Sequence, residues 1–226
     1  MSNNTNDNNM AINPLSANGF ASLFGFSLTE EEIRAVDKGV ELRLEKTPEE
    51  DRFRELIMST NREGAEKLLF FLRHNDFFWV PASVTHSDNE PHGLLKHSLK
   101  VYDEAMKLRE EYLRAHPEEE KNLSADRVLV SALLHDVCKC DAYSVDGNGK
   151  PRKKDELFLV GGHGSKSLIM VLLTGFHLNS DEMLAIRWHM GSRRIKDEDL
   201  KIVCEKAKKD CPLVNIIIQA DYKVTH

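Results

Sequence analysis

The segment Ser131 to Lys139, SALLHDVCK, constrains the fold of this chain most strongly. It overlaps an apolar run at 128–134 and contains two adjacent metal-ligand side chains, His135 and Asp136. Residues at i, i+3, i+4 and i+7 share one side of a helix, so both polar side chains point toward the same interior as the apolar ones. Burying a carboxylate beside an imidazole is costly unless a cation compensates both. We therefore expect a core helix that begins at about Ser124 and runs to Lys139.

A His-Asp pair alone does not establish a metal site, because a satisfied core histidine beside a helix-end aspartate is common. The interpretation depends on further positions where a ligand side chain falls on a predicted apolar face or at a helix start: His97, His163, His189 and Asp221. Asp221 is the clearest, since its helix is very apolar and an unpaired buried carboxylate needs a partner or a raised pKa. Four histidines and two aspartates that face inward indicate one shared site.

Imidazole and carboxylate ligands together suit divalent ions of borderline hardness, namely manganese, iron, zinc, nickel or cobalt, with magnesium as a further option. Six ligands are many for one catalytic ion, which must keep a position open, and they suit two ions. We expect two divalent ions, held by His97, His135, Asp136, His163, His189 and Asp221.

The remaining segments predict helices almost throughout. Thr29, followed by three glutamates, starts a helix to about Lys46, and others begin near Pro48 and Arg62. The aromatic loop at 75–91 is expected to pack on the core. Later helices are expected from Gly93, from His163, from Asn179 to Met190, at 196–210 and at 212–223.

One short region departs from this helical pattern. The residues at 146–149, DGNG, form a strong turn signal between the apolar stretches 143–145 and 157–160. We expect these two stretches to pair as a small β-hairpin. The predicted fold class is therefore all-α, with extra N-terminal helices and a hairpin insertion near 140–160.

Length and composition favour one sizeable core, because 41% of the 226 residues are hydrophobic. We expect a disordered or loosely packed tail at 1–28 and a helical extension packed on the core at 29–90. The ligand-bearing domain is expected to span 91–226. Its oligomeric state is not indicated by the sequence.

The net charge of −6 gives no basic surface for long duplex nucleic acid, which leaves a small phosphorylated substrate or a short nucleic-acid end as the expected partner. The four cysteines form no paired CxxC and are typical of reduced thiols. The chain shows neither a membrane-spanning stretch nor the basic and apolar regions of a signal peptide. We therefore expect a cytoplasmic protein with no membrane partner.

Five segments in order, GLLKHS, LLHDVCK, GGHGSKS, RWHMG and QADYKVT, resemble the HD superfamily of metal-dependent phosphohydrolases over roughly residues 90–226. The resemblance implies that His97, His135, Asp136 and Asp221 form the minimal one-metal set. His163 and His189 are similar to the additional ligands of the two-metal subset, in which Asp136 would bridge the ions. That subset includes cyclic-dinucleotide phosphodiesterases and domains of some 3′-to-5′ exoribonucleases.

The chain departs from relatives at two points. It lacks the GYP signature of the cyclic-di-GMP enzymes, which argues against that substrate. It also carries Cys138 where many members have glycine.

The resemblance implies hydrolysis of a phosphoester in a nucleotide or short oligonucleotide end. Two ions would lower the pKa of a bridging water and hold the phosphoryl oxygens. Asp136 and Lys139 are the catalytic candidates, and Lys139 would face the substrate phosphate. A solvated lysine at a helix C-terminus is the alternative for Lys139. Further candidates for substrate binding are Lys166, Arg187, Arg193 and Arg194, although most arginines in such a run are solvated.

Two alternatives from other classes stay open. Some HD-fold proteins with a similar ligand set hold a di-iron centre and are oxygenases. Others are regulatory domains that bind metal without turnover, although an intact set of six ligands argues against a retired site.

Overall fold

The computed structural model describes residues 46–85, 87–146, 149–193 and 195–226, which belong to one compact unit, 45–226. Our expectations for the tail at 1–28 and for the helix that begins at Thr29 lie outside the described residues. None of the helices in the described ranges combines the length and hydropathy that a membrane crossing requires.

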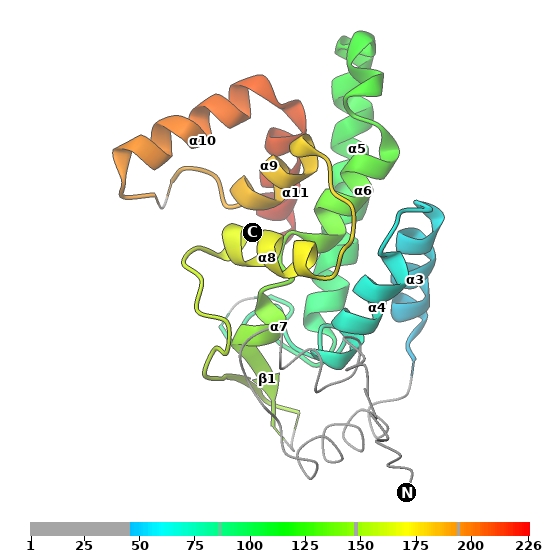
Figure 1. Cartoon of the computed structure of the whole chain (residues 1–226), viewed down its shortest axis with the longest axis vertical. Coiled ribbons are helices and arrows are strands. Elements are labelled where there is room, and N and C mark those ends of the chain that lie inside the picture. The colour runs from blue at the N-terminus through cyan, green and yellow to red at the C-terminus, as the bar shows by residue number, and fades with distance from the viewer. Residues whose placement is uncertain (1–45, 86, 147–148, 194) are drawn as a thin grey trace, which may run out of the picture. The chain divides into compact units, whose positions relative to one another are not determined.

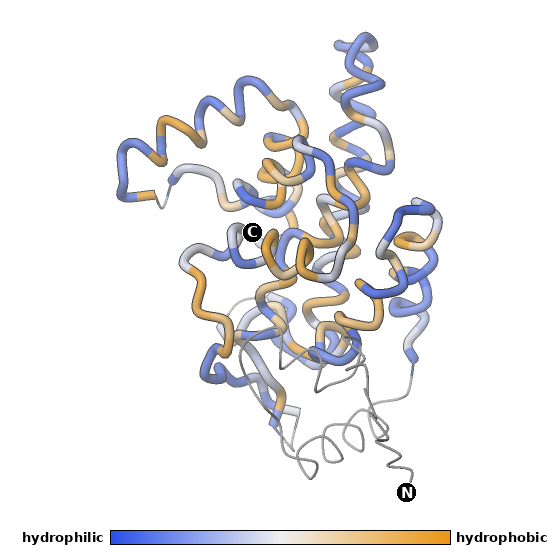
Figure 2. Tube along the Cα trace, in the orientation of Figure 1, coloured by the Kyte–Doolittle hydropathy of each residue, from blue (hydrophilic) through white to orange (hydrophobic). Residues whose placement is uncertain are grey.

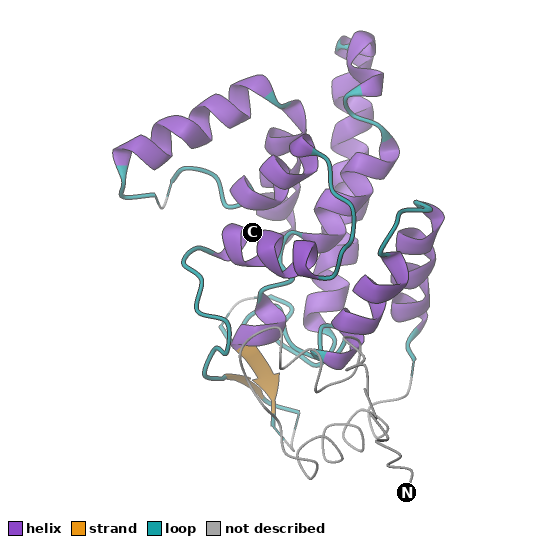
Figure 3. Cartoon of the chain, viewed as in Figure 1, coloured by secondary structure: helices purple, strands orange, loops and turns teal. Residues whose placement is uncertain are grey.

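The regular structure of the described residues is almost entirely helical (Figures 1 and 3), which confirms the all-α class. In chain order the elements are α3 (Pro48–Ser59), α4 (Ala65–His74), α5 (Gly93–Ala115), the 3₁₀ turn η1 (Pro117–Lys121), α6 (Ala125–Leu134), α7 (Lys139–Ala142), β1 (Tyr143–Val145), β2 (Pro151–Lys153), α8 (His163–Leu173), α9 (Ser180–Trp188), α10 (Glu198–Asp210) and α11 (Pro212–Thr225).

Local sequence signals start two of these helices. The Thr47 side chain accepts a hydrogen bond from the backbone N–H of Glu50 at 3.1 Å, and Pro48 occupies the first turn of α3. Asn179 and Glu182 form a reciprocal capping box at the start of α9. Such caps satisfy N–H groups that the first helical turn leaves without partners.

Four helices enclose the main apolar core of this unit. α11 packs against α5 and α9, while α6 packs against α5 and α9. The core they bury includes Val101 of α5, Val128 of α6, Trp188 of α9 and Ile217 of α11. Figure 2 shows apolar residues where these helices meet and mostly hydrophilic ones at the outer end of α5. Five of the six ligand candidates lie on these same helices or directly after them, and His163 begins α8.

The segment before α5 also packs on this core. α3 contacts α5 and α6, and it buries Phe53 and Ile57. The aromatic loop at 75–91 packs as expected: Phe77 and Phe78 are buried with ring centroids 5.3 and 5.4 Å from that of Phe53.

The predicted extent of the central helix was too long. α6 ends at Leu134 rather than Lys139. Beyond it the backbone N–H groups bond three residues back: Val137 to Leu134 at 3.4 Å and Lys139 to Asp136 at 3.0 Å. This tighter winding ends the α-helix at the pair of ligand residues. Ser124 takes the predicted N-cap position, but its side chain makes no capping hydrogen bond.

The predicted second strand of the hairpin was wrong. β1 pairs antiparallel with Pro151–Lys153, in the register Tyr143 to Lys153, and not with residues 157–160. The backbone N–H groups of Leu157 and Phe158 instead donate to the carboxylate of Asp141, at 3.1 and 3.0 Å. A side-chain acceptor thus takes the donors that a strand would have given to its neighbour.

Candidate metal centre

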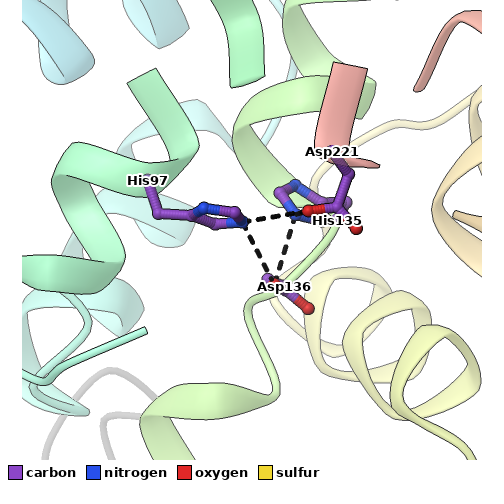
Figure 4. Close-up of side chains that lie close together, drawn as sticks. All are labelled: His97, His135, Asp136 and Asp221. Atoms are coloured by element: carbon purple, nitrogen blue, oxygen red, sulfur yellow. Dashed lines mark ion pairs between the residues drawn. The ribbon is translucent and has the colours of Figure 1, made fainter. Parts of the chain in front are cut away.

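Four of the six predicted ligands converge from three helical segments (Figure 4). His97 lies in α5, His135 and Asp136 follow α6, and Asp221 lies in α11. One ligand atom from each falls within 4.8 Å of all the others. The Nε2 atom of His97 is 3.2 Å from Asp221 Oδ1 and 3.6 Å from Asp136 Oδ2. The Nε2 atom of His135 is 3.2 Å from Asp136 Oδ2.

His189, which directly follows α9, joins the cluster from the other side of Asp136. Its Nε2 atom is 3.3 Å from Asp136 Oδ1, and its ring lies 4.9 Å from that of His135. The two oxygens of Asp136 therefore face different histidines. A carboxylate in this position is able to ligate on both of its sides.

The ends of α6 and α9 determine which ring nitrogen carries the proton in His135 and His189. His135 and His189 are C-cap residues, where the last carbonyls of a helix lack N–H partners. The Nδ1 atom of His135 lies 2.7 Å from the carbonyl oxygen of Ala132, and that of His189 lies 2.9 Å from the oxygen of Ile186. Since a carbonyl only accepts, Nδ1 carries the proton in both rings. The lone pair of each Nε2 then points into the cluster, as a metal ligand requires.

Unpartnered atoms test whether these residues fit a cation. The Nε2 atoms of His97, His135 and His189 and the Oδ1 atom of Asp136 are buried without a hydrogen-bond partner. Buried polar atoms in native proteins are normally paired, because an unpaired one costs about 1–3 kcal/mol. The nitrogens of His97 and His135 lie on the Oδ2 side of Asp136, and that of His189 lies on the Oδ1 side. All four atoms are nitrogen or oxygen donors that suit divalent transition metals. The residues fit a metal ion.

Charge in the cluster also favours a cation. Burial opposes a charged imidazole, but the carboxylates of Asp136, Asp221 and Asp88 outweigh it and raise the pKa of His97 to about 10. Burial alone would raise the pKa of Asp136, yet Lys139 and His135 hold it well below its usual range. Burial is likewise outweighed at Asp221, where His97 lowers the pKa to about 2. Both carboxylates are therefore ionised at neutral pH and attract positive charge.

Comparison with protein families bears on this geometry. The model of the family described as HD domain matches residues 94–224, which is more than half of the chain. The chain belongs to the HD domain family. Its matched region runs from the first turn of α5 almost to the end of α11, and it contains all four clustered ligands. Neither the search of curated proteins nor that of solved structures finds a match.

His163, the remaining predicted ligand of this HD domain, is not among the four clustered residues His97, His135, Asp136 and Asp221. His163 is exposed at the start of α8, with Nδ1 3.7 Å from the Sγ atom of buried Cys138. Cys138 follows Asp136 by two residues in the sequence. Its role as a ligand stays a prediction.

The cationic candidates of the HD domain have different surroundings. Lys139 contacts the cluster directly, with Nζ 2.6 Å from Asp136 Oδ2 and one-fifth of its side chain exposed. Lys166 is buried and paired with two carboxylates, those of Asp141 and Glu156, which already neutralise its charge. Its contribution to substrate binding is a prediction that this pairing disfavours.

The arginine candidates pack on aromatic rings. The guanidinium of Arg187 lies 4.0 Å from the ring centre of Trp188, and that of Arg193 lies 5.3 Å from the ring centre of Tyr222. Arg193 is exposed and its partner follows the ligand Asp221 directly in the sequence. Arg194 lies outside the described residues. Substrate binding by Arg187 and Arg193 stays a prediction.

Sequence reasoning missed one buried carboxylate beside the cluster. Asp88 comes from the loop before α5, and its Oδ2 atom is 3.7 Å from the Nδ1 atom of His97. No local pattern marks it, because it stands in a polar turn, SDNEPHG, where an aspartate is ordinary.

Proposed function

We propose that this HD domain is a metal-dependent phosphohydrolase that hydrolyses a phosphoester of a nucleotide or a short oligonucleotide end. One observation carries the proposal: three buried imidazole Nε2 atoms and one oxygen of the central carboxylate, Asp136 Oδ1, lie close together without hydrogen-bond partners in the described residues. The HD family suggests this type of activity at the superfamily level.

The residues divide into two ligand sets around Asp136. In the proposal, His97, His135 and Asp221 hold one divalent ion together with one oxygen of Asp136. His189, with His163, holds a second ion against the other oxygen. The contact between His189 Nε2 and Asp136 Oδ1 supports this division. When bound, such ions lower the pKa of coordinated water toward neutrality and neutralise charge on a phosphoryl group.

Lys139 has two tasks in this proposal. Its ammonium keeps Asp136 ionised, because the 2.6 Å contact favours the carboxylate form. The same ammonium, at the end of a side chain that is 20% exposed, also stabilises the negative charge that develops on the phosphoryl oxygens. The second task requires that substrate reach the cluster from the side of Lys139.

Exposure supports that direction of approach. The side chains of His135 and His189 are fully buried, whereas those of Asp221 and Lys139 are 17% and 20% exposed. We propose that a small phosphorylated substrate enters on this side. The net charge of −6 supports a small substrate over long nucleic acid, which binds chiefly through many cationic contacts.

The test is phosphate or nucleotide release from a panel of phosphoesters. The panel spans nucleoside mono-, di- and triphosphates, cyclic nucleotides and short oligonucleotides, each with Mn²⁺ and with a chelator. We expect Mn²⁺-dependent turnover of at least one class by the wild type. Asp136→Ala should reduce it to the level of chelator-treated protein, because it removes the central ligand, while far-UV helicity is largely retained.

The matched control is Asp126→Ala, which removes an exposed carboxylate from the first turn of the same helix, α6. This variant should keep wild-type turnover. Metal binding without turnover on the whole panel would contradict the proposal and indicate a regulatory domain. Iron-dependent oxygen uptake without phosphate release would contradict it in favour of an oxygenase. Full metal occupancy in Asp136→Ala would show that the site is misplaced.

A further inference from the structure

The three buried histidines of the cluster differ in where they lie along their helices. His135 and His189 stand at helix C-termini and use carbonyls that the helix leaves free. His97 lies in α5 near its beginning, where each carbonyl accepts the N–H four residues later. In the described residues no backbone carbonyl is hydrogen-bonded to the Nδ1 atom of His97, unlike the Nδ1 atoms of His135 and His189. A side chain is therefore left to orient this ring.

Asp88 is placed to do so. Its side chain is 4% exposed, and its Oδ2 atom lies 3.7 Å from the Nδ1 atom of His97, within ion-pair distance. The other oxygen, Oδ1, is paired with the ammonium of Lys100, one turn after His97 in α5. Oδ2 itself is buried and has no hydrogen-bond partner in the described residues. One oxygen is thus anchored, and the other faces the imidazole.

The backbone around Asp88 is built to hold it there. Asp88 has a φ of 56°, a left-handed conformation that aspartate tolerates better than most residues. Its carbonyl accepts a hydrogen bond from the N–H of Ala82 at 2.8 Å. The same carbonyl oxygen lies 2.0 Å from where a Cβ atom on Gly93 would stand, so only glycine allows this close approach. The loop is fastened to the first turn of α5, four residues before His97.

We propose that Asp88 is a positioning residue for His97. Its carboxylate, with Oδ2 3.7 Å from Nδ1, favours a proton on Nδ1 by electrostatic attraction and so directs the Nε2 lone pair toward Asp136 and Asp221. The pairing is that of a carboxylate behind a metal-ligating histidine, which fixes the tautomer and raises ligand basicity. This inference rests on the metal site of the proposed function, and it adds a residue outside the range that the family model matches.

The first test is the variant Asp88→Asn in the full-length chain. A carboxamide has one acceptor oxygen, so it cannot serve Lys100 and His97 together. We expect the dissociation constant for Mn²⁺, measured from the EPR signal of free ion, to rise about 10–100-fold. The matched control is Asp103→Asn, which alters an exposed carboxylate of α5 that pairs with Arg52. It should leave the constant within about two-fold of the wild type.

A second readout needs no metal and no activity. In chelator-treated protein labelled with ¹⁵N-histidine, the Nδ1 resonance of His97 is assigned by its loss in His97→Gln. Asp88→Asn should shift this resonance and Asp103→Asn should not. An unchanged resonance together with unchanged Mn²⁺ affinity would overturn the proposal. If the wild type binds no Mn²⁺, the proposed function fails, while the resonance still decides whether Asp88 holds His97.

Folding is checked by the near-UV circular dichroism and melting temperature of the chelator-treated variants. Should Asp88→Asn not fold, Lys100→Met replaces it, because the Lys100 side chain is more than half exposed and its loss only frees the carboxylate. A several-fold weaker Mn²⁺ affinity in Lys100→Met would then support the proposal. Wild-type affinity in that variant would overturn it.

Discussion

In the proposed metal site, protons and a metal ion would compete for the same atom of His97. Its Nε2 faces the carboxylates of Asp136 and Asp221, which attract either kind of positive charge. Although burial opposes protonation, these carboxylates raise the pKa of His97 to about 10 from its ordinary 6.5. A group whose pKa is higher in the folded than in the unfolded chain stabilises the fold while it is protonated. A metal ligand, by contrast, has to give up that proton.

Opposite pH dependences follow for the two states of the protein. With chelator, the free energy of unfolding should fall as the pH rises from about 6.5 to 10, because in that window the imidazole of the unfolded chain gives up its proton while that of folded His97 keeps it. Over the same window the affinity for Mn²⁺ should increase. Urea unfolding and Mn²⁺ titration at intervals of one pH unit test both trends. The variant His97→Gln should show a smaller fall of the free energy of unfolding with pH. A chelator-treated wild type whose free energy of unfolding rises toward pH 10 would contradict this prediction.

At the scale of elements, the ligand-bearing helices were predictable because their signals are local. Apolar periodicity, caps and ligand candidates stand on the same helix, as Asn179 and His189 do at the two ends of α9. The end of α6 and the position of the second strand were not predictable, because contacts between residues distant in the sequence determine them. The carboxylate of Asp141 takes the N–H groups of Leu157 and Phe158 that a strand would use. The same holds for Asp88, whose partners His97 and Lys100 only the fold brings close.

The crossing of α8 and α9 depends on one glycine. A Cβ atom on Gly164 would stand 2.1 Å from the carbonyl oxygen of Arg187, a backbone atom that cannot rotate away. Helix propensity alone predicts that Gly164→Ala would stabilise α8 by about 1 kcal/mol. Overpacking costs about 1–3 kcal/mol and more where backbone has to move. We expect the cost of overpacking to exceed the gain in helix propensity.

We therefore expect Gly164→Ala to lower the free energy of unfolding by about 2 kcal/mol, measured by urea denaturation. Gly161→Ala is the matched control, because a Cβ atom there meets nothing within 4 Å and Gly161 is not left-handed. That variant should stay within about 0.5 kcal/mol of the wild type. A Gly164→Ala protein as stable as its Gly161→Ala counterpart would show that α8 and α9 separate without cost.

At the scale of the whole described unit, several ion pairs tie residues before the family match to the HD domain, and two of them differ sharply in burial. Arg62 precedes α4 and forms a bidentate pair with Glu182 of α9, with both distances 2.7 Å. The Glu182 side chain is fully buried and that of Arg62 is 15% exposed. Arg52 of α3 pairs with Asp103 of α5, but both side chains are more than two-fifths exposed. Burial, more than the number of contacts, determines which pair contributes more to the free energy of unfolding.

Removing one partner of a buried pair leaves an uncompensated charge, which costs about 3–5 kcal/mol, whereas an exposed pair contributes about 0–1 kcal/mol. Arg62→Met should therefore lower the free energy of unfolding several times more than Arg52→Met, as measured by urea denaturation. Because the penalty arises from the abandoned carboxylate of Glu182, the double variant Arg62→Met/Glu182→Leu should recover much of the loss, even without the Glu182 cap of α9. Equal losses in the two single variants would mean that the carboxylate finds water or another cation when Arg62 is gone.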